Sequence, residues 1–214
     1  MSLNVLCIVQ ARMNSSRLPG KVLKKIGDKY LIEILLKRLA KSKMVSKFVV
    51  AISNSRKDDI LESKVKKIGF DVYRGDENDV LNRFYKTSKV YKYNTIIRLT
   101  GDCPLIDPNL VDKVVNFYIE NKCDYVSNVN PPTFPDGLDV EVFSADVLRQ
   151  ANKKAKTSFE REHVTPWIRE NKELSVLNFE NDVNYSNNRW TVDQNEDLIL
   201  ISNIFKEFEN NLDF

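Results

Sequence analysis

The chain has 214 residues, of which 42% are hydrophobic and 29% are charged, and Lys plus Arg (33) exceed Asp plus Glu (30) by only three. This length predicts one domain, residues 1–214, with a core large enough to fold without disulfides or a structural metal. The even charge balance argues against nucleic-acid binding, which needs cations concentrated on one face. We therefore expect small-molecule substrates and no nucleic-acid partner.

Scarce residue types exclude further classes. The single histidine and three cysteines provide neither a two-histidine metal motif nor a disulfide framework. Unpaired cysteines are typical of a reducing cytoplasm, where we expect the protein. Neither the glycine-rich dinucleotide motif nor the P-loop motif occurs. No run of 18 apolar residues is found, so no membrane span is predicted.

Short β-branched runs alternate with helical patterns along the first hundred residues. Strands are predicted at 3–9, 48–52 and 95–99, and helices at 31–39, 60–68 and 80–90. This alternation predicts an α/β fold with a mostly parallel sheet that is covered by helices on both faces. Ligands of such folds bind beyond the carboxyl ends of the strands.

The pattern is looser after residue 123. Strands are predicted at 124–128, 138–143, 174–180 and 190–192, and helices at 144–155, 159–170 and 195–209. The strict alternation over 138–143 is typical of a half-exposed strand. We interpret residues 129–187 as an excursion from the sheet that binds a sugar or contacts a second subunit.

A basic loop, residues 10–21 (QARMNSSRLPGK), follows the first predicted strand. It carries Arg12, Arg17 and Lys21 and no acid, and its residues Ser15, Ser16 and Gly20 are expected to offer free backbone N–H groups to an anion. A triphosphate carries about four negative charges, which arginine forks and a lysine match well. A solvated surface loop is the alternative, but the position after the first strand favours phosphate binding.

Two acids are candidates for a metal site. Asp102 follows the strand at 95–99 directly, so its carboxylate is expected in the same crevice as the basic loop, although it could instead cap its own turn. Asp193 with Glu196 matches a capping box before the last helix, a role that can coexist with metal binding. One or two carboxylates are the usual protein share of a Mg²⁺ site that bridges phosphates.

Residues 136–141 and 160–167 offer further polar candidates. The strand period places Asp139 and Glu141 on one face, where they could accept hydrogen bonds from sugar hydroxyls or ligate a second metal. A solvent-facing strand is the alternative. His163 lies among charged residues and is either a site residue or a structural hydrogen-bonding group. Asp107 before Pro108 predicts a helix N-cap.

Five segments together closely resemble the spore coat polysaccharide biosynthesis protein F family of cytidylyltransferases. They are residues 8–21, 98–107, 137–143 (GLDVEVF), 161–166 (REHVTP) and 191–193 (TVD). The resemblance implies a three-layer α/β/α fold of the nucleotide-diphospho-sugar transferase type. It also implies a homodimer and Mg²⁺-dependent transfer of CMP from CTP to a sugar acid or aminosugar in polysaccharide biosynthesis, with release of pyrophosphate.

The resemblance also implies roles for single residues. Segments 51–54 and 74–83 would surround the base and ribose, although Asp76 stands where a small hydroxyl residue is expected. The implied nucleotide-binding residues are Gln10, Ala11, Arg12, Arg17, Lys21, Ser53, Arg74, Arg98 and Asp102, of which Arg12, Lys21 and Asp102 are catalytic. The implied metal ligands are Asp102 and Asp193, and the implied sugar-binding residues are Asp139, Glu141 and His163.

Two other functions stay open at this point. One is a glycosyltransferase of related fold that uses a finished nucleotide sugar, although no Asp-x-Asp motif is present and the basic loop suits a triphosphate better. The other is a nucleotide-binding protein without activity, which the two cleft acids argue against. The reaction product distinguishes a nucleotidyltransferase from a glycosyltransferase, since the former releases pyrophosphate and the latter releases a nucleoside diphosphate.

Overall fold

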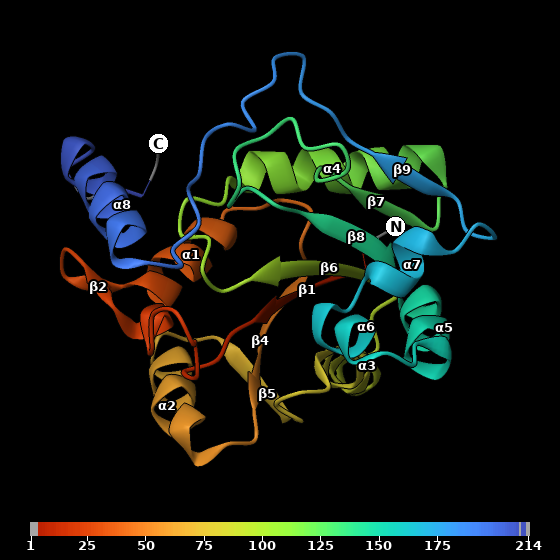
Figure 1. Cartoon of the computed structure of the whole chain (residues 1–214), viewed down its shortest axis with the longest axis horizontal. Helices are drawn as coiled ribbons and strands as arrows, with labels where there is room; N and C mark the ends of the chain where they lie inside the picture. Colours follow the sequence, from red (N-terminus) through yellow and green to blue (C-terminus); the bar gives the residue numbers. More distant parts are fainter. Residues whose placement is uncertain (1–3, 210, 213–214) are drawn as a thin grey trace.

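The structure of the protein is a computed structural model that describes residues 4–209 and 211–212. A seven-stranded sheet with the strand order β5-β4-β1-β6-β8-β7-β9 forms the centre of the molecule (Figure 1). The strands are β1 (Val5–Gln10), β4 (Lys47–Ser53), β5 (Asp71–Gly75), β6 (Thr95–Thr100), β7 (Tyr125–Ser127), β8 (Glu141–Ser144) and β9 (Val176–Asn178). Within this sheet β8 is antiparallel to both neighbours and every other pairing is parallel. The predicted mostly parallel sheet is confirmed.

Helices cover both faces of the sheet. The apolar sides of α1 (Leu31–Leu39), α2 (Asp59–Lys67) and α4 (Pro108–Asn121) pack against one face. The other face is covered by α3 (Val80–Tyr91), α5 (Ala145–Lys154) and α7 (Pro166–Glu170), and α6 (Ser158–His163) contacts α3. The chain therefore has the three-layer α/β/α architecture that the motifs implied.

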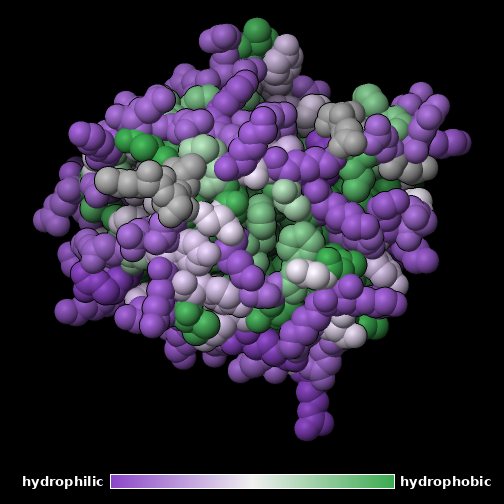
Figure 2. Space-filling model, turned by 180° about the vertical axis from the view of Figure 1, so that it is seen from behind, coloured by the Kyte–Doolittle hydropathy of each residue, from purple (hydrophilic) through white to green (hydrophobic). Residues whose placement is uncertain are grey.

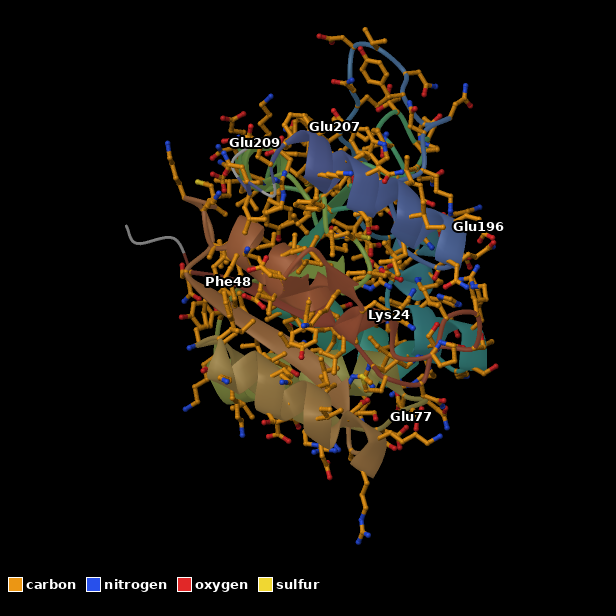
Figure 3. The ribbon with its side chains drawn as sticks, turned by 90° about the vertical axis from the view of Figure 1, so that its left-hand side faces the viewer. Lys24, Phe48, Glu77, Glu196, Glu207 and Glu209 are labelled. Atoms are coloured by element: carbon orange, nitrogen blue, oxygen red, sulfur yellow. The ribbon has the colours of Figure 1, made fainter. Side chains whose placement is uncertain are left out.

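The C-terminal helix α8 (Asn195–Glu207) packs beside the start of the chain. Its residues Ile201 and Phe205 form a third core cluster with Leu18 of the basic loop and Ile26 of a small hairpin, β2 (Lys25–Ile26) and β3 (Lys29–Tyr30). Figure 3 shows α8 along this side, with Glu196 at one end of the helix and Glu207 at the other. This packing brings the residues just before α8 close to the basic loop.

Several predicted elements differ in the structure. The predicted strand 138–143 starts later, at Glu141, and its residues 141–143 are buried, so the half-exposed interpretation is wrong. The predicted helix 159–170 divides into α6 and α7 at Pro166, because proline has no N–H for a continuous helix. No strand forms at 190–192, and Arg189 instead makes an isolated bridge with Asp136.

Other predictions hold, and some elements were not predicted. The strands at 48–52 and 95–99 are confirmed, whereas residue 3 of the first predicted strand lies outside the described residues. Asp107 caps α4 with Pro108 in its first turn, as predicted. The sequence patterns did not reveal β5, α4 as a whole, or the β2–β3 hairpin.

The chain between β9 and α8 forms a loop that projects from the top of the molecule in Figure 1. Seen from behind, the surface is mostly hydrophilic, with hydrophobic side chains exposed near its centre (Figure 2). In the part of the chain that the structure describes, no helix has the length and apolar character needed to cross a membrane.

Candidate active site

The basic loop is folded onto itself and anchored to the sheet. Met13 N–H donates to the buried carboxylate of Asp58 at 2.7 Å, and the Met13 carbonyl accepts from Ser15 N–H at 3.0 Å and Gly20 N–H at 2.9 Å. The expectation of free N–H groups at Ser15 and Gly20 is therefore wrong, because the turn uses both. Gly20 has a left-handed backbone (φ 69°) that directs the chain back toward the crevice.

The ammonium group of Lys21 lies between Asp102 and Asp193, the two acids that are predicted to bind the metal. Its Nζ is 2.5 Å from Asp102 Oδ2 and 2.5 Å from Asp193 Oδ1. The backbone also connects the two acids, since Val192 N–H donates to the Asp102 carbonyl at 2.8 Å. Three residues that are far apart in sequence thus meet beyond the carboxyl ends of β1 and β6.

Charge pairing determines the direction in which the pKa values of Lys21 and Asp102 are shifted. Burial alone would lower the pKa of Lys21, but Asp102 and Asp193 outweigh it and raise that pKa. Burial would raise the pKa of Asp102, yet the lysine charge and hydrogen bonds lower it. Lys21 is therefore cationic and Asp102 anionic near neutral pH, as phosphate and metal binding require.

Asp193 is available to the cluster because it does not cap α8. The capping box uses Gln194 and Asp197, one residue further along than predicted, and Asp197 accepts from the N–H groups of Asp193 and Gln194. The predicted box of Asp193 with Glu196 is wrong. The Asp193 side chain faces Lys21 and also Arg17, whose Nη2 is 2.8 Å away.

Arg189 supports this arrangement and was missed by the sequence analysis. Its guanidinium contacts Asp136 at 2.6 Å, Asp193 at 3.2 Å and Asp197 at 3.2 Å. It therefore connects the excursion to the start of α8. No local pattern marks Arg189, because its partners are assembled by the fold.

A cavity of about 250 Å³ opens above this cluster. Predicted residues that line it are Gln10, Ala11, Arg12, Arg17, Lys21, Asp102, His163 and Asp193. Gly101 allows the close approach of its walls, because a Cβ atom there would lie 2.9 Å from the Cβ of Ala11. Arg12 crosses the cavity toward α6, where its Nη2 is 3.5 Å from Glu162 Oε1.

Three predicted nucleotide-binding residues do not line this cavity. Ser53 is buried and donates its hydroxyl to Asp58 at 2.6 Å. Arg74 is held by carboxylates of α2, 2.6 Å from Asp59 and 2.8 Å from Glu62. Arg98 lines a second cavity, although its Nε donates to Gln10 at 3.3 Å. Their part in nucleotide binding stays a prediction.

The second cavity, of about 320 Å³, adjoins the first. Thr100 and His163 line both, and Asp139, Glu141, Thr165 and Arg169 line only the second. An ion pair between Arg161 and Asp79, 2.5 Å apart, fastens α6 to the start of α3 and so holds His163 over the junction. The three predicted sugar-binding residues therefore lie together, next to the predicted nucleotide site.

Glu141 belongs to a closed buried network. It forms an ion pair with Arg98 and accepts hydrogen bonds from Tyr125 at 2.5 Å and Thr165 at 2.6 Å. Burial would raise its pKa, but Arg98 and these hydroxyl groups lower it. Glu141 is only 4% exposed. The network shapes the cavity wall and leaves little of the carboxylate for a ligand.

Asp139 and Arg169 have more freedom. Asp139 is exposed, and surrounding protein atoms together with Asp136 and Glu141 raise its pKa to about 6. Among the described residues no acid forms a salt bridge with Arg169. The second cavity thus offers one arginine and one carboxylate to a ligand.

The residues present fit a divalent cation that arrives with a nucleotide. Asp102 and Asp193 come close enough to contact one ammonium group, and carboxylate oxygens are the ligands that Mg²⁺ prefers. Within residues 4–209 and 211–212 no group of three or more His, Cys, Asp or Glu side chains is arranged to hold a metal. Phosphate oxygens would have to complete such a site.

Fold and site together define a nucleotidyltransferase. The structure aligns with that of a cytidylyltransferase from Leptospira borgpetersenii with a TM-score of 0.88 and 32% identity, over 97% of this chain and 96% of the other. The parallel sheet, the basic loop after β1 and the two acids accord with this class.

Sequence comparisons identify the family to which the chain belongs. A model described as Cytidylyltransferase matches residues 6–211. The chain is 40% identical to the uncharacterized protein MJ1063 of Methanocaldococcus jannaschii, over 97% of this chain and 85% of that protein. It is also 40% identical to the spore coat polysaccharide biosynthesis protein SpsF of Bacillus subtilis, over 82% of this chain and 74% of that protein. The chain belongs to the cytidylyltransferase family, so the resemblance drawn from the motifs is confirmed.

Proposed function

We propose that this cytidylyltransferase transfers CMP from CTP to a sugar acid or aminosugar and releases pyrophosphate. The observation that carries the proposal is the meeting of Lys21 with Asp102 and Asp193, 2.5 Å from each, in a cavity that Arg12 and Arg17 also line. Cations and acids in one crevice suit a metal–triphosphate better than either charge alone.

In the proposed reaction, the oxygen of a sugar hydroxyl bonds to the α-phosphorus and its proton passes to water. The bond from that phosphorus to the oxygen that bridges the α- and β-phosphates breaks, and this oxygen leaves with pyrophosphate. The protein contributes mainly by positioning and by electrostatic stabilisation. Arg12, Arg17 and Lys21 hold the triphosphate and stabilise the charge that grows on pyrophosphate. Asp102 and Asp193 would hold Mg²⁺, which would supply Lewis-acid polarisation of the α-phosphate.

We also propose that the acceptor binds in the second cavity. Because Thr100 and His163 line both cavities, a sugar hydroxyl near these residues would approach the α-phosphate of a nucleotide in the first. Arg169 is suited to a carboxylate, since arginine presents a planar fork of donors. Asp139 can accept hydrogen bonds from hydroxyl or ammonium groups. A sugar with a carboxylate fits this pair better than a neutral one.

Three further properties belong to the proposal. We expect dependence on a divalent cation, a homodimer with contacts in the 129–187 excursion, and a cytoplasmic location. The family supports the first, and the projecting loop between β9 and α8 offers a surface for the second (Figure 1).

The test is a screen of the four nucleoside triphosphates with Mg²⁺ against sugar acids, aminosugars and neutral sugars. Pyrophosphate release is expected with CTP and with an acceptor that carries a carboxylate or amine. Arg169→Met should raise KM for that acceptor without a matching change in KM for CTP. Release of a nucleoside diphosphate from a nucleotide sugar, with no pyrophosphate from any triphosphate, would refute the proposal.

A further inference from the structure

The backbone is strained directly after His163, the last residue of α6. Val164 has φ 70° and ψ −52°, and the Thr165 N–H donates to the His163 carbonyl at 2.8 Å. This is a γ-turn with positive φ at its centre, a conformation that is rare and strained in proteins. Val164 is β-branched and fully buried, which makes positive φ there a true outlier. Such strain is concentrated at functional sites, so the turn indicates a functional role for the side chain that it positions.

The contacts of α6 hold this turn and His163 in place. Arg161 forms the ion pair with Asp79 of the α3 N-cap, and its Nη1 donates to the Asn152 carbonyl of α5 at 2.8 Å. The imidazole of His163 rests against the ring of Phe159, with the ring centroids 4.6 Å apart. His163 is therefore positioned by the fold although its side chain is exposed.

His163 reaches both cavities with a free ring nitrogen. It lines the nucleotide cavity and the second cavity, and among the described residues only Thr100 does the same. Its imidazole makes no hydrogen bond to any residue that the structure describes. A neutral imidazole carries one acceptor nitrogen, whereas the hydroxyl of Thr100 is not a base at neutral pH. His163 can thus accept a proton where the two cavities meet.

The acids of the first cavity are paired with cations. Asp102 lies 2.5 Å from Lys21, and Glu162, which precedes His163 on α6, lies 3.5 Å from Arg12. A nearby cation favours the ionised form of a carboxylate and makes it a weaker proton acceptor. Neither acid lines the second cavity. They are therefore poorly placed to take a proton from an acceptor sugar.

The charged groups of the second cavity are also unsuited to this step. Glu141 is paired with Arg98 and accepts two further hydrogen bonds inside its closed network. Asp139 lines the second cavity but not the first. Arg169 is a cation and cannot accept a proton at neutral pH. His163 remains as the base at the boundary between the two cavities.

We infer that His163 is the catalytic base that accepts the proton of the attacking sugar hydroxyl. The hydroxyl oxygen bonds to the α-phosphorus, its proton moves to the acceptor nitrogen of the imidazole, and the bond to the bridging oxygen breaks with release of pyrophosphate. The imidazolium then gives this proton to water, to which the exposed side chain has access. The overall reaction is unchanged, and the inference rests on the proposed function.

The test is chemical rescue of variants of the full chain. Pyrophosphate release from CTP, Mg²⁺ and the acceptor found in the screen is measured for His163→Ala and His163→Gln, with and without added imidazole or pyrazole. Glutamine keeps hydrogen-bonding groups without a basic nitrogen, and it provides the answer if the alanine variant does not fold. Pyrazole has a ring of the same size as imidazole but is a much weaker base. Asp102→Asn is the control, because imidazole cannot replace its lost carboxylate.

We expect turnover of both His163 variants to fall by about 10²–10⁴, the usual contribution of a general base. KM for CTP should stay within about twofold of wild type, since the loss concerns the transition state. Imidazole should raise the turnover of His163→Ala by about tenfold or more, whereas pyrazole should not. Neither compound should restore Asp102→Asn.

Three results would overturn the inference. One is near-wild-type turnover of a folded His163 variant. Another is rescue by pyrazole as strong as that by imidazole, which would mean that the ring only fills space. The third is a change confined to KM for the acceptor, which would make His163 a binding residue. If the wild-type protein releases no pyrophosphate from any triphosphate, the proposed function itself fails, and this outcome is recognised before any variant is made.

Discussion

Two clusters, each containing both cations and acids, lie near the carboxyl ends of the sheet strands, and they differ in what surrounds them. Lys21 with Asp102 and Asp193 borders an open cavity, and the side chains are 11%, 22% and 13% exposed. Arg98 with Glu141 is closed by Tyr125 and Thr165, and the Glu141 side chain is 5% exposed. The open cluster can exchange its partners for phosphate and metal, whereas the closed one can only hold the wall in place.

This difference in exposure to a cavity indicates which acids take part in catalysis. Ion pairs that face a cavity keep their charges available, because a ligand can take the place of one member of the pair. Buried pairs that are fully hydrogen-bonded gain nothing from exchange, and breaking them leaves a charge without compensation. The first cluster should therefore govern turnover and the second should govern stability.

The largest expected effect on stability comes from Glu141→Gln. Without the carboxylate charge Arg98 stays buried and unpaired, and breaking such a pair typically costs about 3–5 kcal/mol of the free energy of unfolding. Denaturant unfolding measures the change. Asp146→Asn, which removes one side of an exposed pair with Arg149, should leave the free energy of unfolding nearly unchanged. Equal free energies of unfolding for the two variants would show that the buried pair of Arg98 with Glu141 stabilises the fold no more than an exposed pair does.

Asp102→Asn should have the largest effect on turnover. Loss of this carboxylate removes one proposed metal ligand, and single electrostatic contacts of this kind are worth about 10²–10³ in rate. Pyrophosphate release is the readout, and the unfolding temperature should stay close to that of wild type. Asp107→Asn is the control, since asparagine caps a helix as well as aspartate does. Near-wild-type turnover of Asp102→Asn would refute the metal assignment.

Arg17→Met should have a smaller effect, although Arg17 touches the same Asp193. Its side chain is 62% exposed, and exposed ion pairs contribute roughly 0–1 kcal/mol. We expect KM for CTP to rise by no more than about fivefold, with the effect shrinking at high salt. A loss as large as that of Asp102→Asn would show that exposure is a poor guide to function in this cavity.

The smallest expected effect concerns Asp139 and pH. Its pKa is raised from 3.8 to about 6 in the folded protein, so the folded state binds this proton more tightly than the unfolded state. The ionised carboxylate therefore destabilises the fold above about pH 6, and the penalty disappears below about pH 4. Asp139→Asn should unfold at a higher temperature than wild type at pH 8 and at nearly the same temperature at pH 4. The reverse order would contradict the raised pKa.

Local patterns predicted the parts of the site that depend on one strand. The basic loop and Asp102 each follow a parallel strand, and the carboxyl ends of such strands share one edge. Local patterns did not predict the surroundings of Glu141. The alternation of hydrophobic residues over 138–143 does not reveal its long-range partners, which are Arg98, Tyr125 and Thr165.

Long-range contacts supplied the rest. Arg189 becomes part of the site only because α8 packs against the start of the chain, which no pattern near residue 189 reveals. The segment 74–83 was expected near the base, but its helical period does not tell which of its arginines faces the cavity. Packing decides this, since Arg74 is held by α2 and Arg83 is enclosed in the cavity wall.

The most direct measurement follows the atoms of the nucleotide. The protein is incubated with CTP labelled with ¹³C in its base and ribose, Mg²⁺ and the acceptor found in the screen, and the products are identified by mass spectrometry. We expect a sugar that carries the complete labelled CMP, with one pyrophosphate released for each molecule formed. Label found only in CDP or free CMP, with the sugar unchanged, would contradict it.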